Sequence, residues 1–254
     1  MAIRKILCAM ERGAEKSEAV REAESIAAAH GAELAFFLVA PGDRVTPLLG
    51  RARALEADLI VVNAAEPGGP GGDLAEAVVR HSPCAVLVAR PSPRSGKVLV
   101  ASDLVGPAYP AVGTAVGEAR RRKAKVFLVH DVDTRIAGFT WGVLTALVET
   151  LSDGLMEEQD GAARARMSKA LERFGAEGER LVVHGAPGAA VLRLANSLPA
   201  ELVVIGSPGE STVRTLLIGS VVESIVHWAP CAVLVVPVRG PAVRTVPARA
   251  EATV

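Results

Sequence analysis

The chain has 254 residues, and its 28 Lys and Arg balance its 28 Asp and Glu, so the formal net charge is zero. The aromatic residues are five Phe, two Trp and one Tyr. This composition excludes a protein that binds nucleic acid through a broad basic field or through rows of stacking aromatic side chains. The hydrophobic content of 50% excludes a chain that is disordered throughout.

Three cysteines are too few and too scattered for a disulfide framework. Cys8, Cys84 and Cys231 form no C-x-x-C pair and no Cys and His spacing typical of zinc, so no metal site is predicted. The apolar runs are strand-sized, far below the roughly 20 residues that cross a bilayer, and the N-terminal one is too short for a signal peptide. We expect a cytoplasmic protein that contacts no membrane and no nucleic acid.

In chain order, the first part of the sequence alternates short apolar strands with helical patterns. Four strands lie before, between and after three helices, which are predicted at 14–30, about 43–56 and 72–81. The segment 91–96 is rich in Pro, Ser and Gly and is interpreted as a linker.

After the linker the alternation continues over a longer stretch. Its strands are continuous apolar runs, which are typical of strands buried on both faces, and the alternation predicts a parallel sheet with right-handed crossovers. The predicted strands are 97–102, 125–131, 180–184, 201–206 and 231–237. The predicted helices are about 107–122, 141–176, 188–198 and 219–228. The tail 239–254 shows no period and is expected to be disordered.

Four sequence blocks of the first part recur in the same order in the second part, which indicates two copies of one unit. The matching blocks are Lys5–Glu11 with Lys97–Asp103, Ala32–Val39 with Ala124–Asp131, Ala57–Val62 with Ala200–Ile205, and Ser82–Ala89 with Ala229–Val236. The second copy carries a long insert after its second strand. We predict a shortened unit over 1–92 and a complete unit over 93–238.

Candidate binding residues follow two strands of the second unit. Ligands of open α/β sheets bind at the carboxyl ends of strands where the strand order reverses. Asp103 ends the first strand of the unit, and Gly206 and Gly209 follow its fourth strand, where a missing side chain lets a ligand approach the backbone. Gly219 and Ser220 open the next helix with free N–H groups and a positive dipole end, which suit phosphate.

Few other residues of the sequence suggest a binding or catalytic role. Arg214 lies between the two glycine pairs and is within reach of a bound anion. The histidines at 81, 130, 184 and 227 are scattered and are interpreted as structural residues. No nucleophile and base can be paired from the sequence, so no catalytic residue and no metal ligand are assigned.

The spacing Gly206-x-x-Gly209, nine residues, then Gly219-Ser220, followed by the strand Ala229-Pro-Cys-Ala-Val-Leu-Val-Val236, resembles the universal stress protein family. The resemblance covers most of 97–237 and, in degenerate form, 3–90. It implies an α/β fold of two similar open parallel-sheet units, Rossmann-like and of the adenine-nucleotide-binding type, packed as an intramolecular pseudo-dimer.

The resemblance also implies an ATP site, for which AMP or ADP, with or without Mg²⁺, are alternatives. In that site Asp103 and Val129 flank the adenosine. The residues implied around the ribose and phosphates are Gly206, Ser207, Gly209, Gly219, Ser220 and Val221.

The first unit lacks this pattern. Asn63 and Glu66 stand where the first two glycines of the second unit stand, and the loop is four residues shorter. Asp73 replaces the serine of the helix start, which places a negative charge where a phosphate would lie, and Glu11 replaces the aspartate. We therefore expect one nucleotide per chain.

Assembly and function are predicted at two levels. The last strands of the units, 84–90 and 231–237, are expected to pair antiparallel, and further association into a homodimer stays open. The first functional hypothesis is a nucleotide-binding regulatory protein of the stress response with unidentified protein partners. The alternatives are a slow ATP hydrolase or nucleotide transferase that uses the same loops, and a protein-interaction module that binds no nucleotide.

Overall fold

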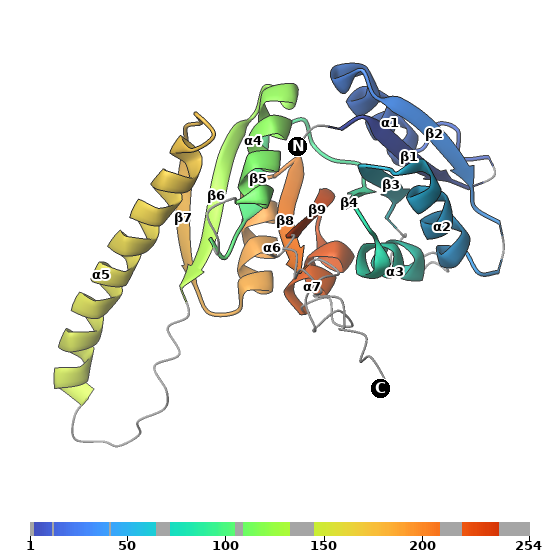
Figure 1. Ribbon diagram of the computed structural model, residues 1–254. Helices are drawn as coiled ribbons and strands as arrows, with labels where there is room; N and C mark the ends of the chain where they lie inside the picture. Colours follow the sequence, from blue (N-terminus) through green and yellow to red (C-terminus); the bar gives the residue numbers. More distant parts are fainter. Residues whose placement is uncertain are drawn as a thin grey trace, which may run out of the picture.

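Strands and helices alternate along the whole chain in the computed structural model (Figure 1). The model describes residues 3–11, 13–40, 42–64, 72–104, 109–132, 145–208 and 220–238. The predicted disordered tail, 239–254, lies outside these residues.

The first half of the described chain contains four strands and three helices. Its first helix begins after Ser17, whose hydroxyl accepts the Val20 N–H, and ends at Gly31, whose φ of 62° a glycine adopts without strain. The elements are β1 (Lys5–Met10), α1 (Glu18–His30), β2 (Glu33–Leu38), α2 (Val45–Leu55), β3 (Leu59–Asn63), α3 (Gly72–His81) and β4 (Ala85–Ala89).

The second half contains five strands and four helices among the described residues. Pro110 and Pro187 stand in the first turns of two of these helices, where a missing N–H costs no hydrogen bond. The elements are β5 (Lys97–Ala101), α4 (Pro110–Arg122), β6 (Lys125–Val132), α5 (Thr145–Glu172), β7 (Gly178–His184), α6 (Pro187–Ser197), β8 (Leu202–Pro208), α7 (Ser220–Trp228) and β9 (Ala232–Val238).

All nine described strands belong to one sheet in the order β2-β1-β3-β4-β9-β8-β5-β6-β7. Pairing is parallel within each half, and β4 pairs antiparallel with β9 where the halves meet, with Leu87 opposite Leu234. The predicted fold class and the predicted antiparallel pairing of the last strands are therefore confirmed. The two half-orders, β2-β1-β3-β4 and β6-β5-β8-β9, place corresponding strands in the same order toward the shared seam.

The insert of the second half consists of α5 and β7. These two elements have no counterpart between β2 and α2, because α2 leads into β3 as α6 leads into β8. As a result β7 ends the sheet on one side and β2, which corresponds to β6, ends it on the other (Figure 1).

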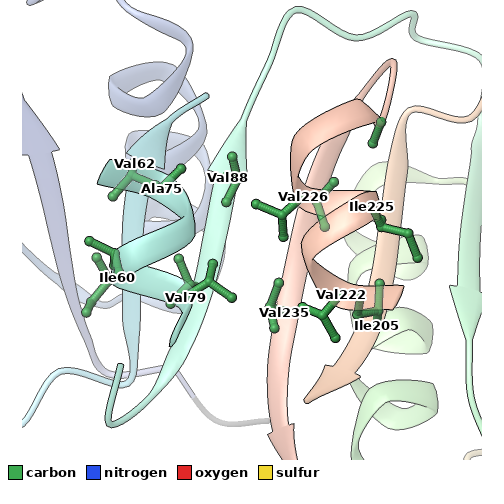
Figure 2. Packing of buried hydrophobic residues seen from close by; sticks show 14 of the residues in the cluster. Ile60, Val62, Ala75, Val79, Val88, Ile205, Val222, Ile225, Val226 and Val235 are labelled. Carbon is green, nitrogen blue, oxygen red and sulfur yellow. The ribbon is translucent and has the colours of Figure 1, made fainter. Parts of the chain in front are cut away.

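Helices cover both faces of the sheet, and each face has a hydrophobic cluster that continues through both halves. One cluster lies under α2, α3, α6 and α7, and the other lies under α1, α4 and α5. Figure 2 shows the seam on the first face, where Val79 and Val88 of the first half lie beside Val226 and Val235 of the second. The halves therefore share their cores.

Polar contacts also join the halves. The Arg90 guanidinium, which follows β4, donates to the Val226 and His227 carbonyls at the end of α7. On the opposite face, Arg121 of α4 donates to Ser25 Oγ of α1 at 2.8 Å. Such contacts fix the angle between the two halves in addition to the apolar seam.

Candidate functional site

The carboxyl ends of β5, β6 and β8 meet at one edge of the sheet. Ala101 of β5 aligns with Val129 on one side and with Ile205 on the other. The chain leaves β5 toward β6, and β8 lies on the opposite side of β5, so the strand order reverses at this point. The topology thus brings Asp103, which follows β5, to the edge at which β8 ends, where open α/β sheets bind ligands.

Three hydrogen bonds hold the backbone that carries Asp103. The Ser102 N–H donates to the Val129 carbonyl at 3.1 Å, and the Ser102 carbonyl lies 2.9 Å from His130 Nδ1. The Ser102 hydroxyl accepts the Leu104 N–H at 3.1 Å. His130 is 6% exposed, so this contact between the ends of β5 and β6 is buried.

Val129 contributes its backbone to this edge. Its side chain is 2% exposed and belongs to the cluster under α6 and α7, and its carbonyl accepts the Ser102 N–H. The predicted position of Val129 beside the adenosine remains a prediction.

Gly206 and Ser207 lie in β8, not in the loop after it. They align with Val236 and Pro237 of β9, so the strand runs two residues beyond the predicted end at 206. The predicted boundary is wrong there because β9 continues to Val238 and offers a pairing partner. Both residues are half-buried at the carboxyl end of the strand.

The corresponding position in the first half is occupied by a capping side chain. Asn63 Oδ1, at the end of β3, accepts the Ala19 N–H in the first turn of α1 at 2.9 Å. Together with Ser17, it satisfies donors that a helix start leaves free. In the second half a glycine, Gly206, stands in the place of Asn63.

The start of α4, which corresponds to α1, has no such closure in the described chain. Tyr109 precedes the helix with a φ of 40°, which non-glycine residues rarely adopt, and makes no capping side-chain hydrogen bond. Its first turn contains no acidic residue. The N–H groups of this turn can therefore donate to a bound anion or to a ligand hydroxyl oxygen at the sheet edge.

The predicted glycine loop is described only at its ends. Ser220 is the exposed first residue of α7, and Val221 packs against the cluster beneath that helix. Gly209, Arg214 and Gly219 lie outside the described residues, as does the loop around Glu66 in the first half. Their predicted roles remain predictions.

Sequence reasoning missed two contributors to this edge. Ser102 carries the hydrogen bonds described above, and Arg166 of α5 places Nη2 3.5 Å from His130 Nε2. A serine directly before the aspartate was a visible signal for a local turn. The contact of Arg166 joins residues 36 positions apart and follows only from how α5 packs.

No three His, Cys, Asp or Glu side chains among the described residues lie close enough to hold a metal ion together. No helix in the described residues combines the length and the apolar character that spanning a membrane requires.

The parallel strands, the helices that alternate with them and the reversal of the strand order define an α/β protein of the Rossmann-like class. The chain belongs to the universal stress protein family, since the model of that family matches residues 95–237, more than half of the chain.

Curated relatives match the second half. A universal stress protein of Methanocaldococcus jannaschii is 26% identical over 140 residues, which are 55% of this chain and 81% of the relative. A protein of Staphylococcus haemolyticus, provisionally named as a universal stress protein, is 32% identical over 145 residues, 55% of this chain and 82% of the relative.

Solved structures match both halves together. A protein of unknown function from Pseudomonas aeruginosa superposes with a TM-score of 0.65 at 17% identity, over 93% of each chain. A universal stress protein of Archaeoglobus fulgidus superposes with a TM-score of 0.54 at 19% identity, over 92% of this chain and 88% of its own. These likenesses show that the two-unit fold occurs in other proteins.

Proposed function

We propose that the second half binds one adenine nucleotide, ATP or its products AMP and ADP, and that the protein is a nucleotide-dependent regulator of the stress response. The proposal includes the division into a shortened unit over 1–92 and a complete unit over 93–238. One observation carries it: Asn63 closes the start of α1 in the first half, whereas Gly206 stands in its place in the second half and no side chain of the described residues caps α4.

The chemistry of the open edge suits a nucleotide. The first turn of α4 offers N–H donors at the positive end of a helix dipole. Ser207, near the carboxyl end of β8, and Ser220, the first residue of α7, add hydroxyl groups. Asp103, on the backbone that His130 and Ser102 hold, would accept hydrogen bonds from ribose hydroxyls or from the adenine amino group. In the first half, Asn63, which stands in the place of Gly206, caps the corresponding helix start instead.

Exchanging the two residues tests the proposal. In Gly206→Asn, the new amide can reach the N–H of Ala111, which corresponds to Ala19, and close the start of α4. We expect nucleotide affinity to fall by at least about tenfold, measured by isothermal titration calorimetry with and without Mg²⁺. Retained far-UV circular dichroism and a melting temperature no lower than that of the wild-type protein would show that the fold persists.

The matched control is Asn63→Gly in the first half. It removes one cap of α1, which costs about 1 kcal/mol of stability, and should leave the stoichiometry at one nucleotide per chain. Mass spectrometry of the denatured wild-type protein would identify any nucleotide that copurifies. Two sites per chain, or unchanged affinity in Gly206→Asn, would contradict the proposal.

A further inference from the structure

The outer edge of β2 presents apolar side chains to solvent. Phe36 is 47% exposed and Leu38 is 51% exposed, and with Trp228 they are the exposed large hydrophobic residues of the described chain. Leu34 packs against the cluster under α1, whereas Ala35 and Phe37 pack against the cluster on the other face. By strand alternation, Phe36 and Leu38 therefore share the α1 face with Leu34.

The second half shows what normally covers this face. Leu128 and His130 of β6 occupy the positions that correspond to Phe36 and Leu38, and they are 0% and 6% exposed. Helix α5 covers them and β7 pairs with the edge of β6. Because α5 and β7 have no counterpart in the first half, β2 loses both its covering helix and its neighbouring strand.

The two edge strands of the sheet differ in their protection against pairing. Strand β7 carries exposed charges at Glu179 and Arg180, and such charges discourage another strand from adding to an edge. Strand β2 contains one charged residue, Glu33 at its first position, and neither proline nor lysine. Strand β2 therefore lacks the residues that usually prevent a further strand from pairing with an exposed edge.

The backbone of β2 is oriented to accept another strand. The N–H groups of Glu33 and Val39 donate inward to the carbonyls of Arg4 and Met10 beside them. Alternation turns the N–H and C=O groups of Leu34, Phe36 and Leu38 outward, away from β1. The residues with outward backbone groups are thus the ones whose side chains lie on the uncovered face.

The geometry points to a second copy of this chain as the partner, with the two β2 strands paired antiparallel about a two-fold axis at Phe36. In this register Phe36 faces Phe36 of the partner subunit, and Leu34 faces the partner's Leu38. The outward backbone groups of each pair then exchange hydrogen bonds, and Glu33 does not face its own counterpart. An identical strand fits because the apolar pattern is self-complementary, and β4 and β9 already join equivalent halves by antiparallel pairing.

Charge reversal of the edge tests this dimer in the full chain. By sedimentation velocity at about 100 μM we expect the wild-type protein at twice its 26.3 kDa chain mass. Phe36→Lys and Leu38→Lys should each weaken dimerisation by at least about tenfold. The first places two lysines opposite each other at the axis, and the second places a charge opposite the apolar Leu34 of each chain. Trp228→Lys is the matched control: it removes an apolar side chain that is 65% exposed, the highest value among the large hydrophobic residues with described burial, and should leave the dimer intact.

A cysteine at the axis tests the register independently. Paired residues at this position bring their Cα atoms to about 5.5 Å, which is within disulfide range. Phe36→Cys should therefore form a disulfide-linked dimer under mild oxidation that reductant reverses, whereas Trp228→Cys should not. The native cysteines give little background because all three are buried.

Each outcome decides the inference. A dimer that both lysine substitutions disperse and that Phe36→Cys crosslinks supports it. A wild-type monomer, a dimer that survives both substitutions, or equal crosslinking of Phe36→Cys and Trp228→Cys would overturn it. Since Phe36 and Leu38 are half-exposed, circular dichroism should show native folding of the variants.

Discussion

At the scale of single residues, burial raises the pKa of two cysteine thiols. Cys8 lies in β1 and Cys231 directly before β9, and neither has exposed surface. Desolvation raises the pKa of each thiol to about 12, and the carboxylate of Glu24 adds to the effect at Cys8. Both thiols therefore stay protonated in the folded protein at pH values where they ionise in the unfolded chain.

This difference predicts a loss of stability in alkali. An unfolded thiol releases its proton near pH 9, so the unfolded state binds fewer protons than the folded state between pH 9 and 12. The free energy of unfolding should fall by about 1.4 kcal/mol per pH unit for each thiol in this range. Urea unfolding at a series of pH values should show a shallower loss in Cys8→Ala than in the wild-type protein, and equal slopes would contradict the prediction.

Residue identity also marks the limit of what the sequence could predict about the site. Asn63 and Gly206 occupy corresponding positions in the two units, and the difference between them contributed to the prediction that only the second unit binds a nucleotide. The hydrogen bond from Ala19 to Asn63 could not be predicted, because it joins positions 44 residues apart through the end of a strand and the start of a helix. Side-chain direction at that meeting point depends on the packing of α1 over β3.

At the scale of elements, α4 packs through a glycine. A Cβ on Gly113 would lie 2.6 Å from Phe174 Cε1, closer than any packed carbon contact. Gly117 lies one turn later on the same helix, and a Cβ there would meet no atom within 4 Å. Two alanine substitutions in one helix should therefore act in opposite directions.

Gly113→Ala should lower the free energy of unfolding by about 1–3 kcal/mol, because the ring of Phe174 must move. Gly117→Ala should raise it by up to about 1 kcal/mol, because alanine favours the helix. Chemical denaturation measures both values. Phe174→Leu should reduce the cost of Gly113→Ala in the double variant, and additive effects of the two substitutions would count against the contact.

The helices α1 and α4 also meet through a buried charge cluster. Glu118 accepts from Arg121 at 2.7 Å and from Arg122 at 3.3 Å, and both arginines reach Glu22 of α1. The Glu118 side chain is 6% exposed. Desolvation lowers the pKa of Arg121, but its bonds to Glu118 and Glu22 outweigh that effect and raise the pKa overall.

Removing one charge from this cluster should be costly. Glu118→Gln leaves two buried guanidinium groups with a single carboxylate, and we expect a loss of about 3–5 kcal/mol in the free energy of unfolding. Arg21→Gln is the control, since its ion pair with Glu18 is 63% exposed on the arginine side and should contribute less than about 1 kcal/mol. Similar losses for the two variants would show that the cluster does not carry the expected energy.

At the scale of the whole molecule, the repeat was the feature of the sequence that predicted most. The blocks Ser82–Ala89 and Ala229–Val236 are nearly identical strands, and two equivalent edges can close the sheet by pairing with each other. The extension of β8 through Ser207 and the cluster around Glu118 could not be predicted in the same way. Both depend on partners in another element, and neither has a counterpart in the other unit.

The shared cores predict how the second half behaves by itself. A chain of residues 93–238 would expose the edge of β9 and the valines of α7 that pack against the first half in Figure 2. Because β4 and β9 are equivalent, we expect two β9 strands to pair antiparallel in place of β4. The truncated chain should sediment as a dimer, and its melting temperature should rise with concentration.

The full-length Phe36→Lys protein is the appropriate comparison, since its β9 remains paired with β4 while its β2 edge carries the added charge. Its melting temperature should not depend on concentration. A stable monomer of residues 93–238 would mean that the seam between β4 and β9 contributes little to the second half. In that case the halves would be independent domains in contact, although their hydrophobic clusters are continuous across the seam.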